Sequence, residues 1–221
     1  MFNAKSALVA LLLSLILPVT GNGSCTTALE VSSPLRVALD HFFANFDTKQ
    51  PFTLIPGESA PYQLRRSGKP SERILEVTLA YADGRRISLA DILPEFVKLN
   101  INKLAPPGTN ANCWAATRAF FDSAFGTKFF SFWDMEEYLR TDFKEIKAGE
   151  RVQMGDVVAV YQGNVLVHSA IYLDPNLVWH KPSSGEDPFT YETLESVIDF
   201  WTDSGRRAMN IKLFHKKPYG S

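Results

Sequence analysis

The sequence has little cysteine, no excess of either charge and only one long apolar run. Its 221 residues include two cysteines and four histidines, and the formal net charge is -1. Nucleic-acid binding needs a basic excess to neutralise phosphates, so the charge balance argues against nucleic acid as a partner. With 45% hydrophobic and 21% charged residues, the chain can bury a core and is not disordered. The length suits one domain, or one domain with a small extension.

The one long apolar run lies at the N-terminus and is typical of a secretory signal peptide. A positive charge precedes the run over residues 7–17, and small residues stand before a cleavage point after Gly21. The run is short for a membrane span, and no second run is long enough for one. The sequence therefore predicts residues 1–21 as a signal peptide and a periplasmic or secreted location. An uncleaved anchor is the alternative, and lipidation at Cys25 is a further one.

Secretion gives the two cysteines, Cys25 and Cys113, two interpretations. An oxidising compartment permits a Cys25–Cys113 disulfide, which would make the chain a stapled binding or structural module without catalysis. Otherwise Cys113 is a free thiol and a candidate nucleophile.

Residues 22–105 carry no recognisable chemistry, and the sequence predicts them as an N-terminal extension of helix and hairpin. Hydrophobic spacing, alternation and turn residues define the expected elements. These are a helix from Ser33 to Phe46, mostly loop over residues 50–70, a strand over residues 73–81, a hairpin turn at Asp83-Gly84, and a short helix over residues 89–99.

Residues 106–221 are predicted as the catalytic domain, with an α+β plan in which a central helix packs on an antiparallel sheet. Thr109 or Asn110 is expected to cap the central helix, and Ser131 with Asp134 resembles a capping box. The expected helices cover residues 111–125, 131–139 and 194–205, the last capped by Thr190, and the expected strands cover residues 157–161, 165–173, 177–181 and 209–213.

Cys113 is expected in the first turn of the central helix. Unpaired backbone N–H groups and the helix dipole favour an anion there, so the sequence predicts a lowered thiol pKa. A thiolate can attack a carbonyl, and the Cys113 N–H is the natural oxyanion donor. A cysteine in an apolar helix is also a common core residue, and this second interpretation stays open.

His168 and His180 fall on consecutive predicted strands, and the parity of the turn decides whether they meet. If residues 172 and 176 pair, the two histidines lie directly opposite, and if residues 173 and 177 pair they are diagonal neighbours. Both registers place the imidazoles on one face, whereas a two-residue or four-residue turn would separate them. Two polar rings on one buried face indicate a site. His41 and His215 are expected at the surface or rim.

Cys113, His168 and His180 could also supply three ligands to a catalytic zinc. The sequence lacks the close Cys-x-x-Cys or His-x-x-x-His spacing that such sites show, so no metal and no cofactor are predicted.

Three segments resemble the second half of the NlpC/P60 cysteine peptidases, a papain-like family that mostly cuts cell-wall peptides. They are Gly155 to Val160, His168 to Leu173 in the pattern His-x-x-Ile-Tyr-Leu, and Val178 to His180. In that family a Gly-Asp turn opens a core strand, a catalytic His begins the next strand, a third polar residue follows, and the nucleophilic Cys stands earlier at a helix start. The resemblance covers about half of the chain, residues 110–214.

The resemblance implies Cys113 as nucleophile, His168 as base and His180 as the group that orients the base, acting on a peptide or peptidoglycan-stem substrate. A monomer is expected. Trp114, Trp179 and Lys181 are expected to contact substrate, with a role in the buried core as the alternative for the two tryptophans, and Asp156 is expected to shape its turn. The nucleophile segment reads Asn-Cys-Trp-Ala where the family usually reads Asp-Cys-Ser-Gly. A thiol acyltransferase of the same fold therefore stays open beside the hydrolase.

Overall fold

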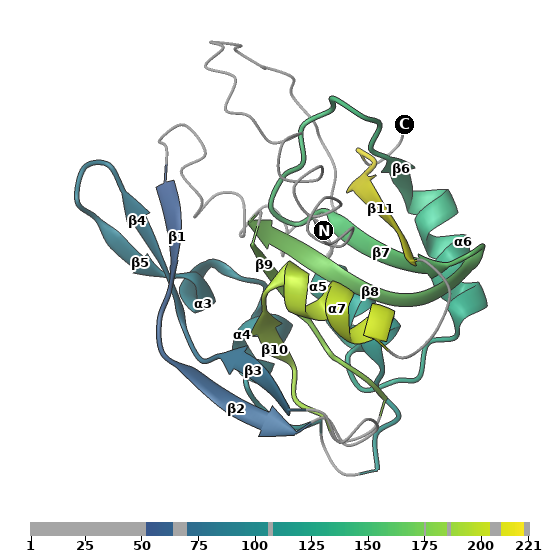
Figure 1. Ribbon diagram of the computed structural model, residues 1–221, viewed down its shortest axis with the longest axis horizontal. Coiled ribbons are helices and arrows are strands. Elements are labelled where there is room, and N and C mark those ends of the chain that lie inside the picture. The colour runs from purple at the N-terminus through teal and green to yellow at the C-terminus, as the bar shows by residue number, and fades with distance from the viewer. Residues whose placement is uncertain are drawn as a thin grey trace, which may run out of the picture.

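An antiparallel sheet of eight strands forms the centre of the computed structural model, in the order β2-β3-β10-β9-β8-β7-β11-β6, and a second sheet has the order β1-β4-β5 (Figure 1). The structure describes residues 52–63, 70–105, 108–174, 176–184, 187–203 and 209–218. The predicted signal peptide, the helix predicted from Ser33, and the residues Cys25 and His41 lie outside these ranges.

The strands are β1 (Phe52–Pro56), β2 (Ser59–Gln63), β3 (Pro70–Ile74), β4 (Val77–Tyr81), β5 (Arg86–Ser88), β6 (Phe143–Glu145), β7 (Val157–Gln162), β8 (Val165–Asp174), β9 (Leu177–His180), β10 (Thr190–Glu192) and β11 (Met209–Lys216). The helices are α3 (Leu89–Ile92), α4 (Glu95–Asn100), α5 (Cys113–Phe121), α6 (Phe132–Asp142) and α7 (Leu194–Asp203), with a 3-10 turn η1 (Ser123–Phe125). This confirms the predicted α+β class.

The two faces of the large sheet are covered by different helices. Side chains of β8 alternate, so that Ile171 and Leu173 join the core beneath α5 while Ala170 and Tyr172 join a smaller cluster beneath α7. Figure 1 shows α7 lying across the sheet near β8 and β9. The sheet therefore separates a larger α5 side from a smaller α7 side.

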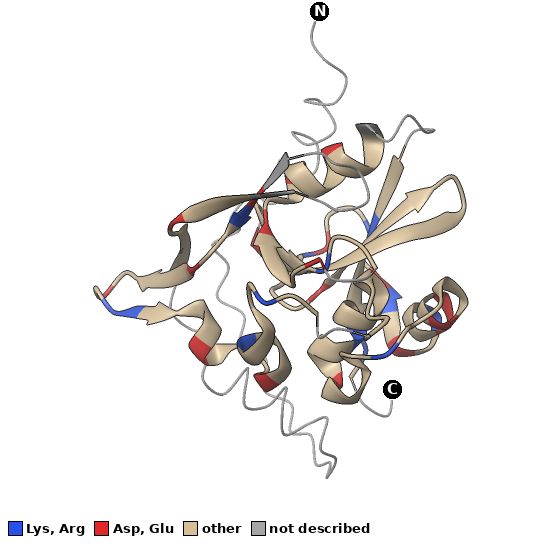
Figure 2. Ribbon diagram, turned by 90° about the horizontal axis from the view of Figure 1, so that it is seen from below, with Lys and Arg blue, Asp and Glu red and all other residues tan. Residues whose placement is uncertain are grey.

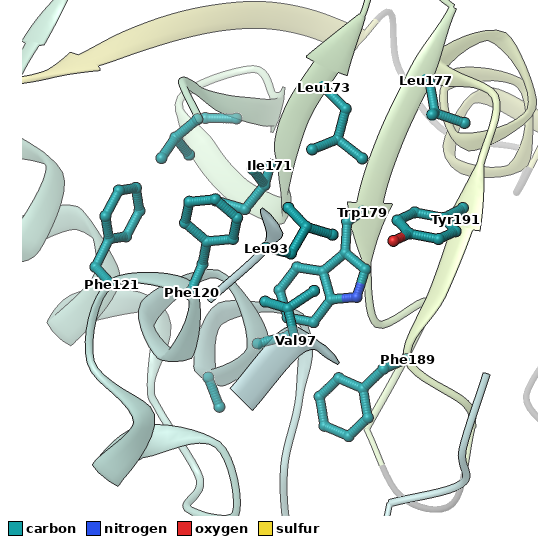
Figure 3. Packing of buried hydrophobic residues seen from close by; sticks show 14 of the residues in the cluster. Leu93, Val97, Phe120, Phe121, Ile171, Leu173, Leu177, Trp179, Phe189 and Tyr191 are labelled. Atoms are coloured by element: carbon teal, nitrogen blue, oxygen red, sulfur yellow. The ribbon is translucent and has the colours of Figure 1, made fainter. Parts of the chain in front are cut away.

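The large core draws on both sides of the boundary predicted between residues 105 and 106. Leu93 and Val97, from the region of α3 and α4, lie in one cluster with Trp179 and Phe189 (Figure 3). Strands β2 and β3 also extend the sheet, through the pair Ile74 and Tyr191. The predicted extension and the predicted catalytic domain share one sheet and one core.

Several predicted elements of the first half differ from the structure. Residues 50–70 contain β1 and much of the β2–β3 pairing rather than mostly loop. The strand predicted over residues 73–81 is two strands in different sheets, β3 and β4. Pro94 separates α3 from α4, because proline has no N–H to continue the first helix. The Asp83-Gly84 hairpin is confirmed, with Gly84 at φ 90°.

In the second half, the capping box of Ser131 and Asp134 is confirmed, and β7, β8, β9 and β11 lie where the sequence placed strands. The expected cap Thr190 is wrong. It lies in β10, and the Thr193 hydroxyl instead accepts the Ser196 N–H at 3.1 Å to start α7.

Charged residues of both signs are scattered along the ribbon (Figure 2). Within the described ranges, no helix has both the length and the apolar character that a bilayer crossing needs.

Candidate active site

Asn112 caps the helix that begins with Cys113. Its side-chain oxygen accepts the Ala115 N–H at 2.9 Å, and its amide donates to the Phe130 carbonyl at 2.7 Å. The expected caps Thr109 and Asn110 are therefore wrong, while Cys113 does lie in the first turn. Asn is a preferred cap because it satisfies an N–H that has no partner within the helix.

The Cys113 thiol is free and buried, with 6% of the residue exposed. Burial raises its pKa to about 12, although the backbone N–H groups of Ser169, Trp114 and Cys113 and the charge of Lys181 act in the opposite direction. The predicted lowering of the thiol pKa is wrong, because desolvation of the sulfur outweighs the donors at the helix start.

Thr117 ties the same helix to β8. Its hydroxyl donates to the Cys113 carbonyl at 3.0 Å and bonds the Ser169 hydroxyl at 2.8 Å. Because the Thr117 proton goes to the carbonyl, Ser169 supplies the proton of the second bond. These contacts fix the start of α5 against the middle of β8, on the face of the sheet opposite to the one that carries the His168 side chain.

The two imidazoles meet as the second predicted register requires. Ile171 pairs with Trp179 and Tyr172 with Val178, which makes His168 and His180 diagonal neighbours. His168 Nε2 lies 3.0 Å from His180 Nδ1, and the rings are nearly perpendicular at 88°. Both side chains are buried.

Glu192 adds a third group that the sequence analysis missed. Its Oε2 lies 2.9 Å from His180 Nε2, and its Oε1 accepts the Ser196 hydroxyl at 2.6 Å. Because Thr190 was predicted as a helix cap, no strand was expected there, and Glu192 of β10 was not recognised as a candidate site residue. The alternating apolar run Phe189-Thr190-Tyr191 was the signal for that strand.

His168 keeps one ring nitrogen without a partner. Its Nδ1 is buried and makes no hydrogen bond, while the ring lies 5.1 Å from the Trp201 ring of α7. Burial, together with the charge of His180, lowers the pKa of His168 well below 6.5, so its imidazole is neutral at pH 7. The Cys113 thiol lies on the α5 side of β8 and the His168 ring on the α7 side, and no hydrogen bond joins the thiol to the imidazole.

The residues expected to contact substrate have different surroundings. Trp179 is buried and stacks on Phe189 at 6.0 Å. Lys181 is buried too, and its ammonium donates to the carbonyls of Ser183 and Asp187 at 3.0 and 2.8 Å. Trp114 is half-buried, and its ring lies 6.4 Å from that of Phe132. Of the three, Trp114 is the one with partial access to solvent.

Asp156 shapes its turn as expected, since its carboxylate accepts the Gln153 N–H at 2.7 Å. The other carboxylate oxygen lies 2.7 Å from Nδ1 of the partly exposed His215. No group of three or more metal-ligating side chains occurs within the described residues.

No family model matches the chain, and no curated protein and no solved structure is significantly similar to it.

Proposed function

We propose that the chain is a cysteine hydrolase that cleaves amide bonds through an acyl-enzyme. One observation carries the proposal. Thr117 ties the start of α5, which carries the Cys113 thiol, to Ser169 of β8, and the adjacent residue His168 has one nitrogen fixed by His180 and an Nδ1 free of hydrogen bonds. A nucleophile, a base and a group that orients the base are the three parts of such a site. The papain-like core, the secreted or periplasmic location and cell-wall peptides as substrate belong to the same proposal.

The uncharged resting states of the Cys113 thiol and the His168 imidazole determine when the proton is transferred. With the thiol pKa raised and the imidazole pKa lowered, the resting pair is thiol and imidazole rather than thiolate and imidazolium. His168 Nδ1 takes the thiol proton as the sulfur attacks the carbonyl, and returns it to the leaving amine. Because the Ser169 and His168 side chains point to opposite faces of β8, the proposed step requires the start of α5 or the His168 side chain to move when substrate binds, so that the thiol reaches Nδ1.

The groups around the sulfur also suit the anionic intermediate. The Cys113 and Ser169 backbone N–H groups lie at the thiol, and they are candidate donors to the oxyanion that forms beside it. Trp114 has the partial exposure that a substrate-contacting residue needs. Trp179 and Lys181 support the site from the core, through Phe189 and the carbonyls of Ser183 and Asp187.

Trapping of the acyl-enzyme tests the proposal. Mature protein is incubated with an activated acyl ester and with cell-wall stem peptides, and the acylated residue is located by mass spectrometry. We expect acyl groups on Cys113, lost in Cys113→Ala, and release of the acyl group by water. Hydrolysis that survives in Cys113→Ala would contradict the proposal. Transfer to an added amine in preference to water would identify the acyltransferase instead.

A further inference from the structure

Glu192 extends the two imidazoles into a chain of three buried side chains. Glu192 Oε2, His180 Nε2, His180 Nδ1 and His168 Nε2 follow one another at 2.9 and 3.0 Å across β10, β9 and β8. The residues are 3%, 2% and 0% exposed, so bulk water does not compete for these bonds. Each bond therefore constrains the proton positions of the next.

The carboxylate end of the chain accepts hydrogen bonds. Ser196 donates to Oε1 at 2.6 Å, and hydrogen bonds to a carboxylate favour its ionised form. An ionised carboxylate is an acceptor only, so the proton between Glu192 and His180 resides on His180 Nε2.

A neutral imidazole carries one N–H, and this fixes the proton positions at the other ring nitrogens of the three hydrogen-bonded side chains. With Nε2 of His180 protonated, its Nδ1 holds a lone pair and accepts from Nε2 of His168. The lone pair of His168 then lies on Nδ1, the nitrogen that has no hydrogen bond. If the chain ran in the opposite direction, His168 would bury an N–H without an acceptor, which is costly.

We propose that Glu192 is a positioning residue that sets, through His180, the tautomer of His168 in which Nδ1 carries the lone pair. The tautomer itself follows from the hydrogen bonds. Only the role of the lone pair, which is to take the Cys113 proton, rests on the proposed function. Ser196 on α7 holds the carboxylate from the other side, so α7 contributes to the site without touching substrate.

Imidazole ¹⁵N NMR of histidine-labelled protein tests the assignment without a substrate. Spectra are recorded above the ordinary imidazole pKa of about 6.5, and His→Gln variants assign the four rings. We expect His180 and His168 both protonated at Nε2 and unprotonated at Nδ1. A wild-type spectrum with His168 protonated at Nδ1 overturns the proposal, whatever Cys113 does.

Glu192→Gln is the decisive variant, because an amide can either accept or donate and no longer selects one tautomer. We expect mixed tautomers at both histidines and a fall in kcat, at most ~10⁴-fold, with KM little changed. Glu195→Gln makes the same chemical change at an exposed site of α7 and should leave both tautomers unchanged. Unchanged tautomers in a folded Glu192→Gln protein also overturn the proposal. The expected tautomers without acylation of Cys113 would refute the proposed hydrolase and leave the assignment standing.

Discussion

Burial shifts the pKa values of the Cys113 thiol and the His168 imidazole in opposite directions, because it favours the uncharged form of each group. The thiol pKa rises and the His168 pKa falls, so both groups are uncharged at pH 7. The sequence predicted the thiol near a helix start and both histidines on one face. It did not predict the sign of the thiol shift, since burial depends on how α5 seats on β8.

The lowered pKa of His168 predicts a specific loss of stability in acid. The unfolded chain takes up a proton near pH 6.5, and the folded chain does not until a lower pH is reached. The free energy of unfolding should therefore fall below about pH 6.5, by up to about 1.4 kcal/mol per pH unit from this group. Urea titrations across this pH range should show a shallower pH dependence in His168→Gln.

His215 provides a control of opposite sign. The hydrogen bond that His215 donates to the Asp156 carboxylate raises the pKa of His215, so its contribution to stability is present below about pH 6.5 and is lost as pH rises through the folded value. His215→Gln should accordingly lose stability mainly at low pH. Equal pH dependence in wild type and His168→Gln would show that His168 is not held neutral.

At the scale of elements, short segments and caps were harder to predict than the long patterned strands. β8 and β9 have strong apolar patterns, and the parity of their turn was enough to bring His168 and His180 together. β10 has three residues, and the sequence analysis assigned its first residue to a helix cap. Glu192 was missed for that reason. The pairing of β10 with β9 and β3 is a long-range contact that local pattern does not reveal.

The cap at Asn112 should matter for both stability and chemistry. Asn112→Ala removes the bond to the Ala115 N–H, and we expect a loss of about 1–2 kcal/mol in the free energy of unfolding by urea. Because the cap positions Cys113, the rate of acyl transfer should fall as well.

Asp122→Ala is the matched control, since it removes the bond to the Ala124 N–H beyond the far end of α5 from Cys113. It should cost about 1 kcal/mol and leave the rate unchanged. Equal effects of the two variants on the rate would argue against a positioning role for the start of α5.

On the scale of the whole molecule, the described residues 70–105 are part of the structure that holds the candidate site. Leu93 and Val97 pack in the cluster around Trp179, and Trp179 lies next to His180 in β9 (Figure 3). The Pro-Pro-Gly break after Ala105 predicts a domain boundary, because local composition indicates turns but not which apolar faces pack together across them.

Leu93 therefore tests whether this region belongs to the core. Leu93→Ala removes a side chain that is 5% exposed and should cost ~2–5 kcal/mol, measured by urea unfolding with tryptophan fluorescence. Leu99→Ala, at a residue 53% exposed, should change stability by at most about 0.5 kcal/mol. A Leu93→Ala effect as small as that of Leu99→Ala would mean that the core after residue 106 is stable without this packing.

The most direct test of the central claim is the pH dependence of Cys113 alkylation by iodoacetamide, with mass spectrometry separating Cys113 from Cys25. If His168 takes the thiol proton, wild-type labelling near neutral pH should exceed that of His168→Gln by ~10²-fold or more, and the two rates should converge at high pH as the thiol ionises unaided. Superimposable profiles for the two proteins would show that His168 does not act on Cys113, and would contradict the account.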